Sequence, residues 1–139
     1  MAEVYAEFGF EISNKFPSVI NEGLALMRRL GEIKVIETRF GAVKMEFEIS
    51  CSNVAYIEEK SEELCEKLEP FVKDFQPFLQ KESDKIYAYI CFVRGESFED
   101  IPVIQIDKRL LNLAHALQAE IHFDFFTKLI ETDITFIGG

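Results

Sequence analysis

The sequence has no tryptophan, no long apolar run and no paired C-x-x-C motif, and these absences exclude several classes of protein. No run approaches the roughly 20 apolar residues that a membrane-spanning helix requires, so we expect no membrane span. Cys51, Cys65 and Cys91 are odd in number and lack ligand-like spacing, which favours free thiols in a reducing compartment over a structural zinc site. The chain also lacks a glycine-rich phosphate loop.

Basic residues are few, with 15 Lys and Arg against 25 Asp and Glu, which gives a net charge of −10. Such a charge repels nucleic acid and anionic membranes and attracts basic proteins, although it also serves solubility alone. The opening stretch MAEVYAEFGFEI alternates acidic and apolar residues and does not resemble a basic signal peptide. We therefore expect a cytoplasmic protein whose partner is neither nucleic acid nor membrane.

Apolar residues are plentiful for a chain of 139 residues: 48% are hydrophobic, and 14 are phenylalanine. This amount suffices for one well-buried core, and the length argues against two domains. We predict a single α+β domain over residues 1–139, with phenylalanine filling much of its interior.

Residues 101–126 are predicted to form a strand, a helix and a second strand, around which the rest of the fold is organised. Residues 101–106 are rich in β-branched side chains, and Asp107 can cap the helix that follows. The apolar positions of that helix recur every three or four residues and are Leu110, Leu113, Ala114 and Leu117. Residues 121–126 alternate in the manner of a strand, so we expect two parallel arms joined by a helix.

The same periodicities divide the rest of the chain into strands and helices. They predict a half-exposed strand at residues 3–12, a helix at 14–30, an antiparallel hairpin at 33–49, helices at 53–69 and 71–79, a buried strand at 86–93 and an edge strand at 129–137. Pro70 should end or kink the long helix. The predicted fold is α+β, with a mixed, mainly antiparallel sheet, about three helices on one face, a ferredoxin-like first part and a C-terminal β-α-β unit.

The segments SEELCEKLEPFVKDFQPFLQ, KIYAYICFV and PVIQIDKRLLNLAHALQAEIHFDFF lie between Ser61 and Phe126. Together they resemble a bacterial family of small uncharacterised α+β domains that includes toxin-immunity-like proteins. The resemblance implies an α+β domain that occurs beside bacterial toxins. It supplies no catalytic residue, and it does not cover the N-terminal half.

Alternation places several acidic residues and a tyrosine on the outward face of two predicted strands. These residues are Glu3, Tyr5, Glu7, Glu11, Glu46 and Glu48. Tyr87 and Tyr89, or their alternating neighbours, join this face if helices leave it open. Such a face suits a basic protein partner, although any half-exposed sheet also needs polar outer residues. We expect a non-catalytic immunity protein that neutralises a cognate toxin domain, such as a basic nuclease, through this surface.

The helix at residues 53–69 offers an alternative acidic surface, which is also what a solvated helix face would look like. Its acidic residues are Glu58, Glu59, Glu62, Glu63 and Glu66. A different class of function is a small enzyme or ligand-binding domain with a pocket near His122 and Asp124, two residues apart on one strand face. No third ligand or nucleophile has diagnostic spacing, so we expect neither an enzyme nor a cofactor or metal. A third alternative is a homodimer that pairs the edge strand at 129–137 with its copy.

Overall fold

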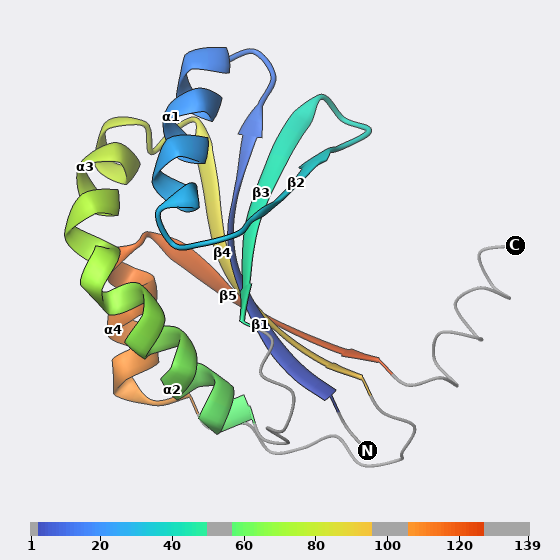
Figure 1. Ribbon diagram of the computed structural model, residues 1–139, viewed down its shortest axis with the longest axis vertical. Coiled ribbons are helices and arrows are strands. Elements are labelled where there is room, and N and C mark those ends of the chain that lie inside the picture. Colours follow the sequence, from blue (N-terminus) through green and yellow to red (C-terminus); the bar gives the residue numbers. More distant parts are fainter. Residues whose placement is uncertain (1–2, 50–56, 96–105, 127–139) are drawn as a thin grey trace, which may run out of the picture.

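A computed structural model describes residues 3–49, 57–95 and 106–126, which form a five-stranded sheet with helices on one side (Figure 1). The strand order is β2-β3-β1-β4-β5. The strands are β1 (Glu3–Ser13), β2 (Lys34–Glu37), β3 (Ala42–Ile49), β4 (Ile86–Gly95) and β5 (Ala119–Phe126). Three pairings are antiparallel, and β4 with β5 is the parallel one. The predicted α+β class with a mixed, mainly antiparallel sheet is confirmed, whereas the ferredoxin-like likeness of the first part stays a prediction.

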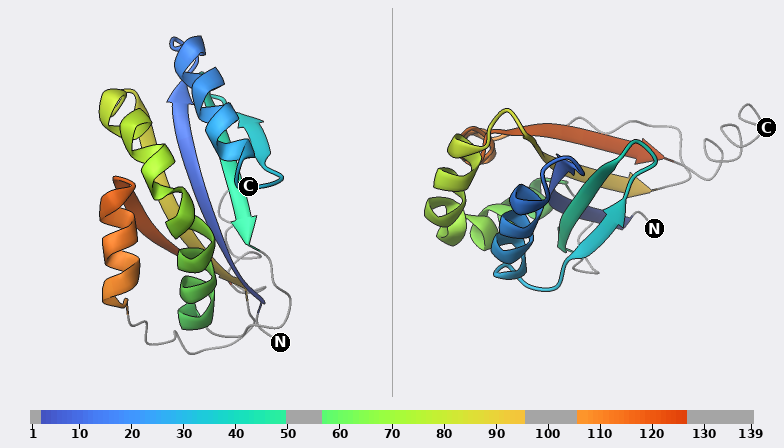
Figure 2. Two further views of the ribbon diagram at one scale, coloured as in Figure 1. Left: turned by 60° about the vertical axis from the view of Figure 1, so that its left-hand side comes forward. Right: turned by 90° about the horizontal axis from the view of Figure 1, so that it is seen from above.

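Three helical segments cover the sheet, and all lie on the same side of it (Figures 1 and 2). They are α1 (Pro17–Arg28), the bent segment α2 (Ile57–Leu68), η1 (Glu69–Phe71) and α3 (Val72–Lys81), and α4 (Lys108–Ala116). The bend falls at Pro70, as predicted, because proline has no amide hydrogen and its ring excludes the carbonyl four residues earlier. None of the helices in the described ranges is long and apolar enough to cross a bilayer.

Phenylalanine fills the core between sheet and helices, as the composition predicts. The helix-facing side chains of β1 are Ala6, Phe8, Phe10 and Ile12, all fully buried. Phe10 packs edge-on against Phe8 and Phe75, with ring centroids 5.2 and 5.8 Å apart, and it also contacts Phe78. The helix face is therefore an aromatic layer, buried from solvent, that dispersion and the hydrophobic effect stabilise.

A C-terminal β-α-β unit exists, but the strand predicted as its first arm stays a prediction over residues 101–105. Residues 101–105 lie outside the described residues, and Ile106 is 41% exposed and belongs to no strand. The parallel neighbour of β5 is β4, so the unit is β4-α4-β5. The helix start is as predicted: Asp107 Oδ1 accepts a hydrogen bond from the Leu110 amide at 2.8 Å. The predicted edge strand at 129–137 lies outside the described residues.

β4 runs between β1 and β5, which agrees with its continuously apolar sequence. One of its faces packs under the helices through Ala88, Ile90 and Phe92. On the other face Tyr89 and Val93 are only 6% and 5% exposed, although none of the helices in the described ranges covers that side. The sheet itself contributes to the burial of Tyr89, whose hydroxyl bonds Glu46 and whose ring lies beside that of Tyr87.

Candidate functional site

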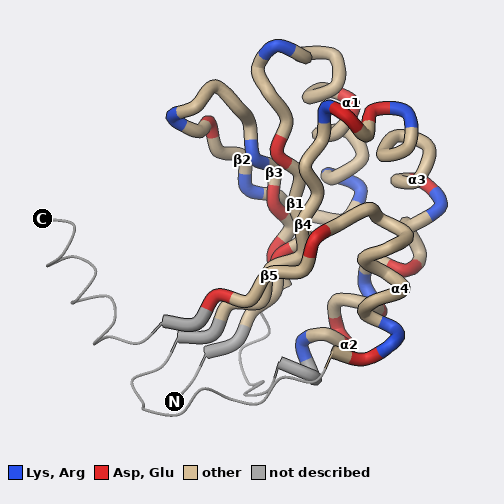
Figure 3. The backbone as a smooth tube through the Cα atoms, turned by 180° about the vertical axis from the view of Figure 1, so that it is seen from behind, with Lys and Arg blue, Asp and Glu red and all other residues tan. Residues whose placement is uncertain are grey.

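The side of the sheet on which none of the described helices lies, called here the open face, carries most of the polar side chains of the strands together with their tyrosines. Figure 3 shows acidic residues distributed over β1, β3 and β5 in the view from behind. The register places Gly9 between Glu46 and Tyr89, and it places Cys91 between Glu7 and His122. Residues from four strands that are distant in sequence thus form continuous rows across the open face.

The predicted partner-binding residues fall on this face. Tyr5, Glu7 and Glu11 project from β1, and Glu46 and Glu48 project from β3, with Glu7 directly opposite Glu48. Glu3 begins β1, and its side chain lies outside the described residues. The alternation in the sequence therefore brought together five of the six predicted side chains.

Tyr89 lies flat against the sheet because its neighbour on β1 is a glycine. A Cβ atom at Gly9 would lie 2.6 Å from the Tyr89 hydroxyl and 3.0 Å from the Met45 carbonyl oxygen. The Tyr89 hydroxyl donates a 2.5 Å hydrogen bond to Glu46 Oε2. Burial and this carboxylate raise the pKa of Tyr89 above its ordinary value, so the phenol remains a donor.

Glu7 and Glu46 form a carboxyl pair next to Tyr89. Burial, the charge of Glu46 and a hydrogen bond to it raise the pKa of Glu7 to about 7, with a further contribution from Glu48. Lys34 on β2 opposes the shift. Glu7 is therefore protonated in a large fraction of molecules at neutral pH, and the pair holds less than two full negative charges.

His122 is oriented by Tyr87, whose hydroxyl oxygen is 2.6 Å from His122 Nε2. Glu120 Oε1 lies 3.5 Å from both the Tyr87 hydroxyl and His122 Nε2. The predicted pairing of His122 with Asp124 holds for the strand face, but the carboxylate within ion-pair distance of the ring is Glu120. The aromatic row continues to Tyr89, whose ring centroid is 5.7 Å from that of Tyr87.

These groups surround a hollow of about 400 Å³ on the open face. We call it the central hollow; its lining residues are Glu7, Lys44, Glu46, Tyr87, Tyr89, Cys91, His122, Phe123 and Asp124. Burial, together with Glu7, Asp124 and Glu46, raises the pKa of the Cys91 thiol to about 11. A thiol that stays protonated at neutral pH is a poor nucleophile. The arrangement is thus better suited to binding than to covalent chemistry.

Metal binding gains no support from the residues that the structure describes, because they contain no cluster of three or more His, Cys, Asp or Glu side chains able to hold an ion. Cys65 and Cys91 are free thiols, and Cys65 is buried on the helix side. Cys51 lies outside the described residues.

The alternative acidic surface on α2 is described for three of its five side chains, and one of these three forms an ion pair. Glu62 and Glu66 are exposed, but Glu63 is 3.3 Å from the ammonium of Lys60, a side chain with no exposed surface. The side chains of Glu58 and Glu59 lie outside the described residues. The helical periodicity did not indicate that Lys60 would be buried.

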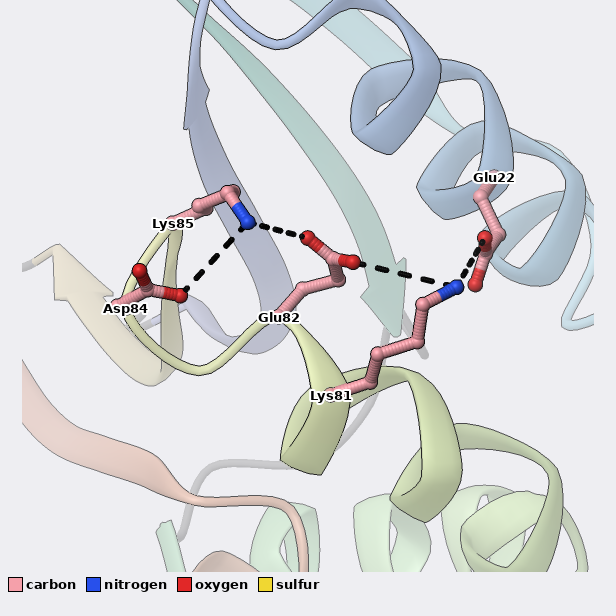
Figure 4. A network of polar contacts seen from close by, with 5 residues as sticks. All are labelled: Glu22, Lys81, Glu82, Asp84 and Lys85. Atoms are coloured by element: carbon pink, nitrogen blue, oxygen red, sulfur yellow. Dashed lines mark hydrogen bonds and ion pairs between the residues drawn. The ribbon is translucent and has the colours of Figure 1, made fainter.

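Charges on the helix side are largely matched locally. Figure 4 shows a chain of contacts in which Lys81 bridges Glu22 and Glu82, at 3.8 and 3.9 Å, and Lys85 bridges Glu82 and Asp84, at 3.1 and 4.0 Å. This network joins α1 to the turn between α3 and β4. In the central hollow, by contrast, carboxylates adjoin carboxylates.

Sequence reasoning missed the contact between Gly9 and Tyr89, the role of Lys44 and the pairing of Tyr87 with His122. One signal was available: an isolated glycine within an otherwise regular strand often marks close approach of another group. The other contacts depend on which strands are neighbours, which the periodicity of a single strand does not report.

Comparison of the chain with protein-family models, curated proteins and solved structures found no match. The resemblance of residues 61–126 to a bacterial family therefore stays a prediction. Functional argument rests on the open face and its central hollow.

Proposed function

We propose that the protein is a non-catalytic binding protein whose open face receives a basic protein partner. One observation carries the proposal: a sheet face without helices collects carboxylates and tyrosines around a hollow of about 400 Å³. A face that merely contacts water needs only dispersed polar side chains. Aromatic anchors amid charges of one sign are instead typical of protein interfaces.

The like charges support this proposal because they are costly in the isolated protein. Glu7 lies directly opposite Glu48 and is hydrogen-bonded to Glu46, and directly opposed like charges destabilise an antiparallel strand pair. A cationic partner would convert this repulsion into attraction. A local loss of stability of this kind is expected at functional sites, where side chains are selected for binding and not for the stability of the fold.

We further propose that the partner is a bacterial toxin domain and that this protein is its cytoplasmic immunity protein. The net charge of −10 and the resemblance of residues 61–126 support this identity. A nuclease must present a basic surface to its phosphate substrate, and an acidic face of complementary shape would cover that surface and exclude the substrate.

The test compares two variants with equal changes in charge. Glu11→Lys with Glu48→Lys alters the open face, and Glu62→Lys with Glu66→Lys alters α2. Wild type and both variants are immobilised, exposed to lysate of the source organism at low salt, and eluted with rising salt. We expect one basic protein to be held by the wild type and by the α2 variant, and to elute at much lower salt from the open-face variant.

The captured protein is then purified and its association rate is measured. We expect the open-face variant to associate roughly tenfold more slowly at low salt, because steering depends on the charge of the face. An excess of wild-type protein should abolish the activity of the captured protein. Equal retention by all three proteins, or selective loss from the α2 variant, would show that the open face is not the binding surface.

A small enzyme or ligand-binding domain is the second candidate, favoured by the position of His122 within the central hollow. His122→Ala distinguishes the candidates, because it removes the imidazole that Tyr87 orients in the central hollow. Loss of a measurable activity in a folded variant would favour the enzyme. Unchanged capture of a basic protein by the same variant would favour the binding protein.

A further inference from the structure

We propose that the central hollow is the binding site for an arginine side chain, with the guanidinium held by Glu7 and Glu46 and packed against a tyrosine ring. The inference deepens the proposed function and rests on it for the source of the arginine, a basic protein partner. It assigns a specific ligand chemistry to one part of the open face.

The first argument is the position of the two carboxylates. Glu7 and Glu46 come from adjacent antiparallel strands, lie diagonally to each other in the register, and both line the central hollow. Glu46 Oε2 already accepts from Tyr89, which fixes the orientation of that carboxylate. A guanidinium presents several N–H donors in one plane, so it can satisfy the remaining oxygens of both groups together.

The second argument is the aromatic wall of the hollow. The rings of Tyr87 and Tyr89 lie 5.7 Å apart, and the ammonium of Lys44 is 5.8 Å from the Tyr89 ring centroid. That contact shows that a cation approaches this ring within the range of a cation–π interaction. Guanidinium groups stack on aromatic faces and are more weakly hydrated than ammonium groups, which favours arginine over lysine as the ligand.

The third argument is the balance of charge around Glu7. Charged and titratable side chains surround Glu7 from all five strands. They are Tyr5 on its own strand, Glu46, Glu48 and Lys44 on β3, Lys34 on β2, Tyr89 and Cys91 on β4, and Asp124 on β5 across the hollow. Lys34 and Lys44 are the cations around Glu7, against the three carboxylates of Glu46, Glu48 and Asp124 and that of Glu7 itself. An incoming guanidinium would offset this excess of negative charge.

The experiment uses three peptides that differ at one side chain: N-acetyl-Gly-Arg-Gly-amide, the citrulline analogue, which is nearly isosteric but uncharged, and the lysine analogue. Binding to the full chain is followed by amide chemical shifts. We expect the arginine peptide to shift signals of β1, β3 and β4 around the hollow. We expect at least tenfold weaker binding of the citrulline peptide and intermediate binding of the lysine peptide.

Two single substitutions locate the site. Glu46→Gln should weaken binding of the arginine peptide about tenfold, whereas Glu22→Gln, an equal charge change on α1 at the helix side of the sheet, should alter it by less than about twofold. Because glutamine can still accept from Tyr89, the fold is expected to persist, and the amide spectrum verifies it. Binding should also tighten from pH 6 to pH 8, since Glu7, with its pKa of about 7, loses its proton over that range.

Equal affinity for the arginine and citrulline peptides, or equal losses in Glu46→Gln and Glu22→Gln, would overturn the inference. The results also separate it from the proposed function. If the arginine peptide binds but no basic protein is captured, the arginine site in the hollow stands and the proposal of a protein partner fails. If capture depends on Glu11 and Glu48 but the arginine peptide does not bind, the proposal of a basic protein partner stands and the arginine site in the hollow fails.

Discussion

The two faces of the sheet are built from the same strands, yet different forces hold them together. On the helix face, Phe8 and Phe10 are buried by helices and stabilised by dispersion and the hydrophobic effect. On the open face, Tyr89 and Val93 reach similar burial although none of the described helices lies above them. There Tyr89 packs beside Tyr87 and bonds Glu46, on a surface that includes carboxylates that repel. The helix face thus stabilises the fold, whereas repulsion between carboxylates on the open face lowers the free energy of unfolding.

The largest expected effect is removal of an aromatic ring from the helix face. Phe10→Ala should lower the free energy of unfolding by about 3–5 kcal/mol, because the cavity left among Phe8, Phe75 and Phe78 cannot collapse fully. Tyr87→Ala, on the open face and 38% exposed, should cost only about 1 kcal/mol. Urea denaturation measures both. Equal losses would contradict the distinction between the faces.

A smaller effect is expected where the backbone of the open face touches a side chain. Gly9→Ala should cost about 1–3 kcal/mol, because the new methyl group meets the Tyr89 ring and the Met45 carbonyl. In a Tyr89→Ala background the same change should cost less, since only the 3.0 Å contact with the Met45 carbonyl oxygen remains. The difference is the coupling energy of a double-mutant cycle. A coupling near zero would show that Tyr89 does not need the glycine.

Removing a charge from the open face should stabilise the protein, with a defined dependence on pH. The pKa of Glu7 is raised from its ordinary 4.5 to about 7, so the folded state holds this proton more tightly than the unfolded state. The resulting stability is complete below pH 4.5 and is lost as the pH rises through 7. Glu7→Gln should therefore match the wild type near pH 5 and exceed it at pH 8 by about 1 kcal/mol, after allowance for solvent screening of a half-exposed group.

Thermal unfolding at the two pH values measures this gain. Glu22→Gln serves as the control, because that carboxylate lies on the helix side and pairs with Lys81. It should show no gain at pH 8. A Glu7→Gln variant that is less stable than the wild type at pH 8 would contradict the account of the carboxyl pair.

The smallest expected effect concerns an exposed carboxylate at the margin of the hollow. Glu48 lies opposite Glu7, so Glu48→Gln should stabilise the protein by a few tenths of a kcal/mol at low salt. The gain should disappear at about 0.5 M salt, where the Debye length is only a few ångströms. Denaturation at both ionic strengths checks it, and a gain that persists at high salt would exclude a charge effect.

Much of the fold could be predicted because its signals are local. The alternation from Val4 to Ile12 identified β1 and its buried face, and Asp107 marked the start of α4. Pro70 marked the bend between α2 and α3. Each of these three signals depends only on a residue and its near neighbours in sequence, because backbone sterics and the period of burial determine local structure. The strand-like composition of residues 101–106 favoured them as the parallel neighbour of β5. The structure gives β5 the parallel neighbour β4, and a strand at residues 101–105 stays a prediction because these residues lie outside the described ranges.

The site was predicted only in part, for a related reason. The acidic residues of β1 and β3 were found, since alternation alone decides which face they occupy. The central hollow was not found, because it depends on β4 lying beside β1 and on β5 lying beside β4. The pairing of strands distant in sequence is set by the packing of the whole domain and leaves no periodic trace within any one strand.

The position of β1 has a consequence for biosynthesis. Its neighbours are β3 and β4, and Tyr5 pairs with Val93, from a distant part of the chain. During synthesis, the central strand β1 therefore leaves the ribosome before the other strands of the sheet. Its neighbour β4 leaves much later. Until β4 emerges, the nascent chain carries an apolar strand with an unsatisfied edge, the type of surface that chaperones bind and that self-associates when folding is delayed. Assembly of the sheet from its middle outward makes slow, non-local folding an inherent property of this topology.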